Sequence, residues 1–273
     1  MDRNIDEVEF TIFDTETTGL EPETGDRIVE VAAMRFKAEK IIATFDTLVN
    51  PHREVSPAAF QVNHITQEVL ESAPDSEIVL PKFLDFIRGS CLCSYNIGFD
   101  LKFLNNELKL SAIELPKDVL AVDILKMAKR LMPGSERYAL WFVSEKLGII
   151  TEQKHRAFSD VELTLKVFYK FKEMLKLKGI VDFKNFLRLF SVDQFFLNNI
   201  NNERIAQIQE AIDLGVKLKI KYLSSSGAEV TQREVFPKEI KQENGNSYLV
   251  GFCSLRNDER TFRIDGILHL EII

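Results

Sequence analysis

The sequence predicts an α/β protein with a mixed β-sheet flanked by helices, followed by a small β-rich unit. Strand-like and helical segments alternate through most of the chain, whereas short strand-like segments dominate after residue 203. The 273 residues suffice for two units, each with its own core. A content of 45% hydrophobic and 28% charged residues is typical of a packed globular protein.

The first strands form an antiparallel meander in this prediction. From Val8 to Phe13 apolar and polar residues alternate, which indicates a strand, and the turn sequence Thr17-Thr18-Gly19 follows. Two further β-rich segments, Ile28 to Phe36 and Lys40 to Asn50, are separated only by a short polar connection. Three consecutive strands with short connections pair in antiparallel order.

Two short apolar segments, Cys91 to Tyr95 and Val119 to Val122, predict buried strands, each followed by a helix. Ser159 and Glu162 resemble a capping box, so a long helix is expected from near Ser159 to near Gly179. The sequence thus predicts a helix-covered sheet that continues past the meander.

A Phe-rich helix is expected to join the two units. Its apolar residues recur at helical spacing and predict a face that packs in the core or between the units: Phe183, Phe186, Leu187 and Phe190. We therefore divide the chain into residues 1–178, a connector of residues 179–203, and residues 204–273. The last part is predicted to hold one short helix, from Arg204 to Leu214, and then the strands of a small twisted sheet or barrel.

Composition excludes several classes of protein. The longest stretch without a charged residue, Val55 to Gln67, is too short and too polar to span a bilayer, so no membrane association is expected. The acidic N-terminus does not resemble a signal peptide, which favours a cytoplasmic location.

Three cysteines without CxxC spacing predict small core residues. The net charge of −7 argues against an extended basic clamp for nucleic acid but permits carboxylates that hold divalent metals.

Four carboxylates and one histidine are the candidates for chemistry. Asp14 and Glu16 are two residues apart near a strand end, so extended backbone directs both to one side, where they can share a hard divalent cation. Asp100 and Asp160 fall in the first turns of predicted helices, and His155 precedes Asp160 by five residues. Taken singly, these three are also explained as helix N-terminal charges and a solvated loop histidine.

Three segments in this order resemble the motifs of the DEDDh family of 3′-to-5′ exonucleases, relatives of bacterial proofreading subunits. The segments are Phe13 to Leu20, Asn96 to Asp100, and His155 to Asp160. The resemblance implies a ribonuclease-H-like fold, two Mg²⁺ or Mn²⁺ ions held by the four carboxylates, and His155 as general base. It also implies that Thr17, Thr18 and Phe99 hold the terminal nucleotide. His64 belongs to a segment that departs from the family, because this chain reads Val62-Asn63-His64-Ile65-Thr66 instead of Val-His-Gly-Ile-Thr.

The C-terminal segment resembles the WYL domain, a small SH3-like β-rich module, in residues that include Ile220-Lys221-Tyr222 and Tyr248-Leu249-Val250-Gly251. The chain has Ser247 at the position of the naming tryptophan and Gly266 where an arginine is frequent. The resemblance implies that this unit binds nucleic acid or a nucleotide. A pocket with guanidinium forks for phosphates and a ring for stacking is one interpretation of its candidates, and solvated strand-face residues are the other. The candidates are Tyr222, Arg233, Arg256 and Arg263.

The function expected is a metal-dependent 3′-to-5′ exonuclease that releases nucleoside monophosphates from single-stranded ends, of DNA ahead of RNA. Two alternatives stay open. One is a regulatory protein that holds nucleic-acid ends without significant catalysis. The other is a proofreading subunit that docks on a polymerase, or on a repair partner, through the Phe-rich helix region.

Overall fold

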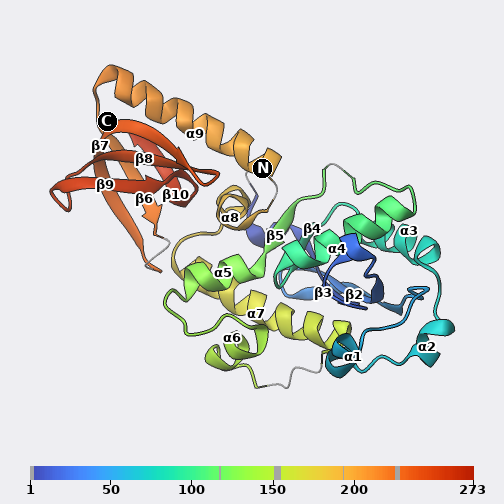
Figure 1. Ribbon diagram of the computed structural model, residues 1–273. Helices are drawn as coiled ribbons and strands as arrows, with labels where there is room; N and C mark the ends of the chain where they lie inside the picture. Colours follow the sequence, from blue (N-terminus) through green and yellow to red (C-terminus); the bar gives the residue numbers. More distant parts are fainter. Residues whose placement is uncertain (1–2, 117, 151–154, 193, 225–227) are drawn as a thin grey trace.

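A computed structural model of the chain describes residues 3–116, 118–150, 155–192, 194–224 and 228–273, without the side chains of residues 194–200. It contains two five-stranded sheets, and the short helix α8 (Phe183–Phe190) lies between them (Figure 1). The fold is therefore α/β with a separate β-rich C-terminal part, as predicted.

The first sheet has the strand order β3-β2-β1-β4-β5 and is mixed. Strand β1 pairs antiparallel with β2 and parallel with β4, β2 pairs antiparallel with β3, and β4 pairs parallel with β5. The predicted meander is confirmed. The strands are β1 (Glu9–Thr17), β2 (Ile28–Lys37), β3 (Lys40–Leu48), β4 (Cys91–Ser94) and β5 (Ala121–Asp123).

Helices cover both faces of this sheet, because its central strands are apolar on both sides. Phe10 and Ile12 of β1 pack in a core with α5 to α8, whereas Phe13 packs in a second core with α3 and α4. The helices of this part are α1 (Pro57–Asn63), α2 (Gln67–Glu71), α3 (Ser76–Ile87), α4 (Ile97–Leu110), α5 (Ile124–Leu131), α6 (Leu140–Lys146) and α7 (Ala157–Leu177). Short 3₁₀ turns, Ile5–Glu7 and Pro22–Thr24, flank β1.

Two element boundaries differ from the sequence prediction. Strand β1 continues past Phe13 to Thr17, because pairing with β2 extends to the pair Thr17 and Ile28. Helix α7 begins at Ala157 and not at Ser159, and its N-cap is Arg156, whose side chain makes no capping hydrogen bond. The predicted capping box is wrong because Glu30, from a distant strand, accepts the hydrogen bond of the first helical amide, Ala157 N.

The Phe-rich helix α8 belongs to the core, as its spacing predicts. Phe186 and Phe190 are completely buried, and the ring of Phe186 lies 5.7 Å from that of Phe10 and 6.1 Å from that of Phe168. Replacing such a ring by alanine typically costs about 3–5 kcal/mol. The use of these phenylalanines as a docking surface for a polymerase is thereby excluded, because a buried ring is not available to a partner.

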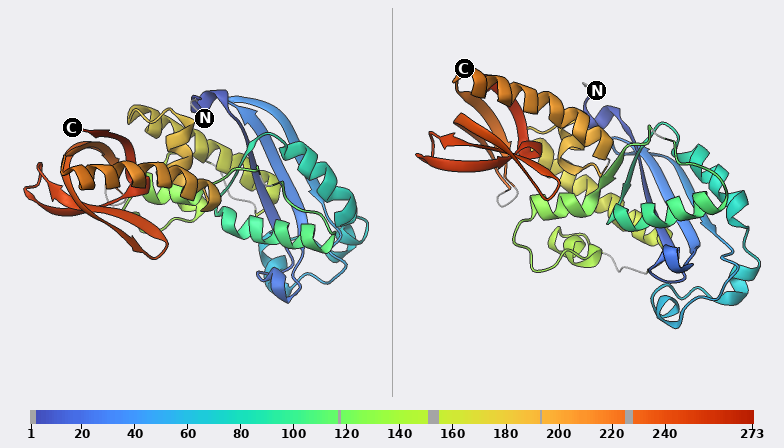
Figure 2. Two further views of the ribbon diagram at one scale, coloured as in Figure 1. Left: turned by 90° about the horizontal axis from the view of Figure 1, so that it is seen from above. Right: turned by 45° about the horizontal axis from the view of Figure 1, so that its top comes forward.

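The second sheet is wholly antiparallel, with the order β10-β6-β7-β8-β9. Its strands are β6 (Leu218–Leu223), β7 (Val230–Glu243), β8 (Asn246–Cys253), β9 (Asp258–Arg263) and β10 (Ile267–Ile272), with a 3₁₀ turn at Ile264–Gly266. The expected short helix is in fact the long helix α9 (Gln194–Leu214), which lies along one side of this sheet (Figure 2). Cys91, Cys93 and Cys253 are free and buried, which confirms their role as core residues.

The two parts share apolar and polar contacts. Leu223 and Leu268 of the C-terminal part are buried in the same core as α5 and α8. Arg130 on α5 donates to Asp265, with 3.2 Å between Nη2 and Oδ1. The relative placement of the two sheets is thus fixed by packing as well as by the chain between them.

Candidate metal centre and nucleic-acid site

Asp14 and Glu16 lie on one side of β1, two residues apart on an extended strand. Asp160, in the first turn of α7, joins them. One carboxylate oxygen of each lies within 4.8 Å of the others, so the three meet at one point. Hard oxygen donors at this spacing form the type of ligand set that Mg²⁺ and Mn²⁺ take.

The concentration of negative charge perturbs these carboxylates. Burial, followed by the charges of Asp100 and Glu16, raises the pKa of Asp14 well above its usual value. Burial and then the charge of Asp160 raise the pKa of Glu16 to about 8. Carboxylates placed so close together need cations to be ionised near neutral pH. The electrostatics therefore fit a site for divalent metals.

Asp100 lies beside this cluster, and its oxygens are bound within the protein. Its Oδ1 accepts hydrogen bonds from the amide and the hydroxyl of Thr15, at 3.0 and 2.8 Å, and its Oδ2 accepts one from Ser94. Burial raises the pKa of Asp100 to about 6, although these hydrogen bonds oppose the rise. The arrangement follows from the fold, because β4 runs parallel to β1 and α4 starts at their carboxyl ends.

Glu30 fixes the start of α7. It is 2% exposed on β2 and accepts hydrogen bonds from Arg156 Nε and Nη2 and, at 3.0 Å, from Ala157 N. Asp160 is three residues further along the same helix. The position of Asp160 beside β1 thus depends on a carboxylate that the sequence motifs do not include.

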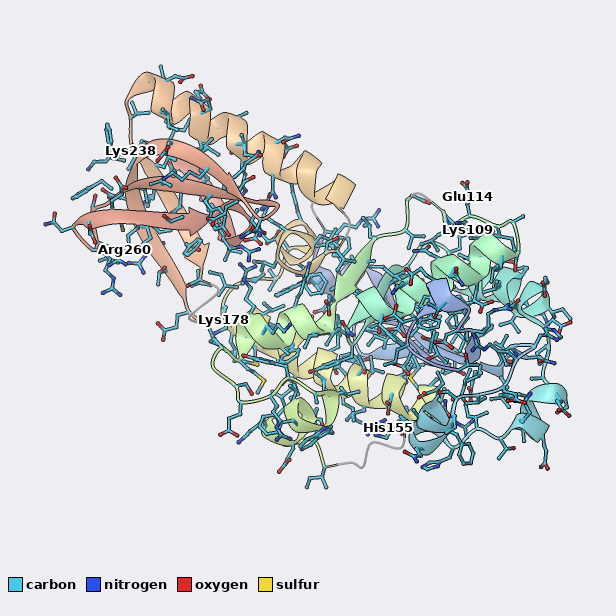
Figure 3. The ribbon with its side chains drawn as sticks, viewed as in Figure 1. Lys109, Glu114, His155, Lys178, Lys238 and Arg260 are labelled. Carbon is cyan, nitrogen blue, oxygen red and sulfur yellow. The ribbon has the colours of Figure 1, made fainter. Side chains whose placement is uncertain are left out.

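His155 is exposed and directly precedes Arg156, just before α7 (Figure 3). Its backbone is left-handed, with φ of 49°. Residues 151–154 lie outside the described part of the chain. The histidine is therefore held on its C-terminal side by the contact between Arg156 and Glu30.

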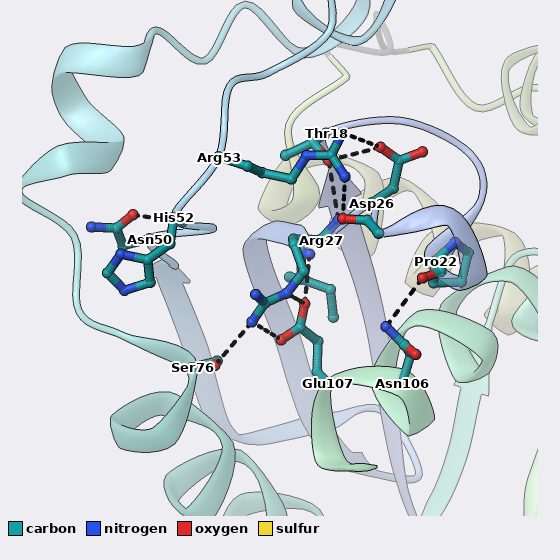
Figure 4. Close-up of polar contacts among 12 residues, drawn as sticks. Thr18, Pro22, Asp26, Arg27, Asn50, His52, Arg53, Ser76, Asn106 and Glu107 are labelled. Atoms are coloured by element: carbon teal, nitrogen blue, oxygen red, sulfur yellow. Dashed lines mark hydrogen bonds and ion pairs between the residues drawn. The ribbon is translucent and has the colours of Figure 1, made fainter. Parts of the chain in front are cut away.

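The loop after β1 is held by polar contacts to the start of β2 (Figure 4). Thr18 donates its hydroxyl to Asp26 at 3.2 Å, accepts from Arg27 N, and donates its amide to the Arg27 carbonyl. Arg27 is in turn paired with Glu107 on α4 at 2.7 Å. A Cβ at Gly19 would lie 2.2 Å from the carboxylate of Asp26, so a larger residue there would displace the side chain that binds Thr18. Thr18 thus shapes the loop through contacts inside the protein.

The segment that departs from the family packs against the same loop. Asn63 is 1% exposed, and its Nδ2 lies 3.4 Å from the carbonyl of Thr17. His64 ends α1 with a left-handed backbone, φ of 55°, and its side chain is exposed. Thr17 donates its hydroxyl to Gly19 O at 2.6 Å. Phe99 is half-buried on α4, with its ring 4.9 Å from that of Phe103.

The candidates in the C-terminal part do not converge on one pocket. Tyr222 accepts a hydrogen bond from the backbone amide of Arg263 at 3.3 Å, and Arg263 faces a pocket between the two parts. Arg233 lines a separate pocket with Lys219 and Leu255. Arg256 is exposed in the turn between β8 and β9. Of the four, the structure brings only Tyr222 and Arg263 together.

Glu30 is the site residue that sequence reasoning missed. A signal was present, because Glu30 is the one charged residue in the apolar segment Ile28 to Met34. A carboxylate in a buried strand requires a partner, which marks it as a positioning residue. Its partner, Arg156, lies within the segment His155 to Asp160, but no separate role was predicted for it.

A mixed sheet with a cluster of carboxylates at the end of its first strand fits a nuclease domain. The model of the exonuclease family matches residues 11–168, and that of the WYL domain matches residues 203–272. The chain belongs to the exonuclease family, and a WYL domain follows. Both resemblances noted in the sequence are thus confirmed.

Curated relatives are replication proteins. The DNA polymerase III subunit epsilon of Treponema pallidum is 39% identical over 163 residues, which are 59% of this chain and 75% of that protein. The PolC-type DNA polymerase III of Thermotoga petrophila is 37% identical over 179 residues, which are 66% of this chain but only 13% of that protein. The chain therefore matches a small part of the PolC-type polymerases.

Solved structures share the fold. Exonuclease X in complex with 5′ overhanging duplex DNA aligns with a TM-score of 0.50 and 26% identity, over 62% of this chain and 93% of that one. The complex of E. coli ExoI with single-stranded DNA aligns with a TM-score of 0.60 and 16% identity, over 97% of this chain and 64% of that one.

The described part of this chain contains no helix long and apolar enough to cross a membrane.

Proposed function

We propose that this protein is a divalent-metal-dependent 3′-to-5′ exonuclease that releases nucleoside monophosphates from single-stranded ends, of DNA ahead of RNA. The observation that carries the proposal is the meeting of Asp14, Glu16 and Asp160 within 4.8 Å. Cleavage of nucleic-acid strands from the 3′ end is also the chemistry that the resemblance to the DEDDh family implies.

The residues have separate roles in this proposal. Asp14, Glu16 and Asp160 would hold the ions, together with Asp100 once its carboxylate is released by Thr15 or Ser94. Two bound Mg²⁺ or Mn²⁺ ions would stabilise the charges that develop on the attacking and leaving oxygens of a phosphodiester. His155, which is exposed before α7, accepts the proton of the attacking water. Thr17, Thr18, His64 and Phe99 would position the terminal nucleotide.

The test uses 5′-labelled single-stranded DNA, single-stranded RNA and duplex DNA, each with Mg²⁺, Mn²⁺ or EDTA. A ladder that shortens from the 3′ end, with Mg²⁺ or Mn²⁺ but not with EDTA, is the expected result. Binding of these strands without any shortening would instead support the alternative of a regulatory protein that holds nucleic-acid ends.

The C-terminal part is proposed to bind nucleic acid or a nucleotide, which would serve the exonuclease by holding the strand or by regulating it. A polymerase or repair partner is a further proposal, supported by the similarity to the subunit epsilon of T. pallidum. Since the Phe-rich helix is buried, such a partner would contact another surface. Co-purification of a polymerase with the tagged protein tests this proposal.

A further inference from the structure

A pocket of about 320 Å³ lies between the two parts of the protein. Helices α5 and α8 line it from the exonuclease part, and Arg263 with the turn between β7 and β8 lines it from the WYL domain. Its volume falls near the lower end of the usual range for small-ligand sites, about 300–1,000 Å³. It is separate from the carboxylate cluster, because none of its lining residues belongs to that cluster.

The pocket is strongly cationic in a protein of net charge −7. One acidic residue among those that line it, Asp265, faces five cationic ones: Lys126, Lys129, Arg130, Arg188 and Arg263. Asp265 already pairs with both Arg130 and Arg263. Asp265 therefore leaves most of this positive charge without an anionic partner among the lining residues.

Two of the guanidinium groups have unused donors. Arg188 is 4% exposed, and its Nε has no hydrogen-bond partner among the described residues, although its Nη1 donates to Asn185 at 2.6 Å. The Nε of Arg263 is likewise buried and without a partner in the described part of the chain. Buried donors of this kind are costly unless a ligand or water satisfies them. Burial lowers the pKa of Arg188 to about 10, although the charges of Asp182, Glu203 and Asp265 oppose this shift.

The exonuclease part supplies most of the charge. At Gly266 of the WYL domain no side chain fits, because a Cβ there would lie 2.7 Å from the carbonyl of Leu223. The guanidinium of Arg130 comes within 3.4 Å of that Cβ position. Arg130 of α5 thus lies beside Gly266, the position at which the WYL domain itself has no side chain.

We propose that this interdomain pocket binds the phosphate group of a nucleotide or of a single strand, with the cations of α5 and α8 and Arg263 as its donors. Guanidinium and ammonium groups that converge on a small polar cavity match the charge and the several acceptor oxygens of a phosphate. This inference deepens the binding role proposed for the C-terminal part, and it does not depend on the cleavage activity. Because both parts contribute, an occupied pocket stabilises their relative placement.

The test measures binding to the whole chain in EDTA, where the exonuclease site holds no metal ion that could bind phosphate. Fluorescence anisotropy with a 20-nucleotide labelled oligothymidylate is one arm, and the shift of the melting temperature by thymidine 5′-monophosphate is the other. Lys129→Ala and Arg263→Ala are compared with wild type, and Arg263→Lys checks that the fold survives. Lys109→Ala, an exposed lysine on α4 far from the pocket, and Arg260→Ala, an exposed arginine on β9 that does not line the pocket, are the controls.

Each pocket variant is expected to weaken binding by about tenfold and to reduce the salt dependence of strand binding by about 0.7 per lost phosphate contact. An effect on the oligonucleotide alone identifies a phosphodiester as the ligand, and an effect on the monophosphate as well identifies a nucleotide. The proposal is overturned if neither probe responds to the pocket variants, or if Arg260→Ala weakens binding as much as Arg263→Ala. Cleavage by wild type with Mg²⁺ is assayed separately, so failure of the proposed activity remains distinguishable.

Discussion

Glu30 on β2 and Arg156 before α7 form an ion pair that joins the sheet to the helix carrying Asp160, with both Nε and Nη2 of Arg156 bound to the same carboxylate. The pair is asymmetric, because the Glu30 side chain is 3% exposed and that of Arg156 is 49% exposed. Removing the arginine would leave a buried charge, whereas neutralising the glutamate leaves a solvated one. The second change is therefore the better probe of positioning.

Glu30→Gln is expected to lower kcat by about 10–100-fold, the usual effect of losing a group that orients metal ligands. It also weakens the contact that positions the start of α7, and with it Asp160, so the Mg²⁺ concentration for half-maximal activity should rise. The measurement is kcat and KM at several Mg²⁺ concentrations. Glu9→Gln is the matched control, because Glu9 on β1 also pairs with an arginine, Arg35 on β2, but outside the carboxylate cluster. Equal kcat for both variants at saturating Mg²⁺ would contradict a positioning role for Glu30.

Asp14→Asn and Asp160→Asn are expected to reduce cleavage by at least about 10³-fold, because each removes an oxygen ligand from the cluster while preserving its volume. The proteins should remain folded, since charge repulsion in the cluster is relieved. Cleavage of labelled single strands and the melting temperature in EDTA check the two expectations. Activity within about tenfold of wild type, in protein free of host nucleases, would refute the assignment of these ligands.

The order of strands in the first part could be predicted because each step is local. Alternating residues and short connections indicate the meander, and buried strands followed by helices indicate the parallel pairs. Asp14 and Glu16 were predicted to meet because their spacing on a strand is fixed by backbone geometry. The convergence with Asp160 came from the family resemblance and not from local pattern.

Contacts between distant segments could not be predicted from the sequence. The start of α7 depends on Glu30, which is 127 residues away from Ala157, so a local capping pattern at Ser159 misled the prediction. The interdomain pocket combines residues of α5, α8 and β9, and no short segment contains its charge. The sequence predicted a binding pocket within the WYL domain alone. In the structure, Arg263 of that domain packs toward α5 and α8 of the exonuclease part.

His155→Ala is expected to lower kcat by on the order of 10²–10⁴ without a comparable change in the Mg²⁺ requirement, because the histidine is a proton acceptor in the proposal and not a ligand. The remaining activity should increase with pH as hydroxide replaces the missing base. The measurement is the pH–rate profile of both proteins, with His52→Ala as control, since His52 is exposed and pairs with Asp75. A variant whose profile matched that of wild type would exclude His155 from proton transfer.

The metal-free protein is expected to lose stability as the pH rises. Burial and neighbouring carboxylates raise the pKa of Glu16 from 4.5 to about 8, and they raise the pKa of Asp14 as well. Between these values the folded state binds more protons than the unfolded chain, so the stabilisation present below about pH 4.5 is lost as the pH rises through about 8. Mg²⁺ should reverse this trend and stabilise the protein more at about pH 8 than at about pH 5.5, because it binds the ionised carboxylates.

The measurement is the melting temperature across this pH range, in EDTA and with Mg²⁺. Glu16→Gln should flatten the decline in EDTA and weaken the stabilisation by Mg²⁺, since the amide neither ionises nor serves well as a ligand. Glu162→Gln, an exposed change on α7 outside the cluster, controls for the loss of one negative charge. If wild type and Glu16→Gln showed the same pH dependence in EDTA, the carboxylate cluster would not be the source of the perturbed titration. If Mg²⁺ stabilised both equally, Glu16 would not be a ligand.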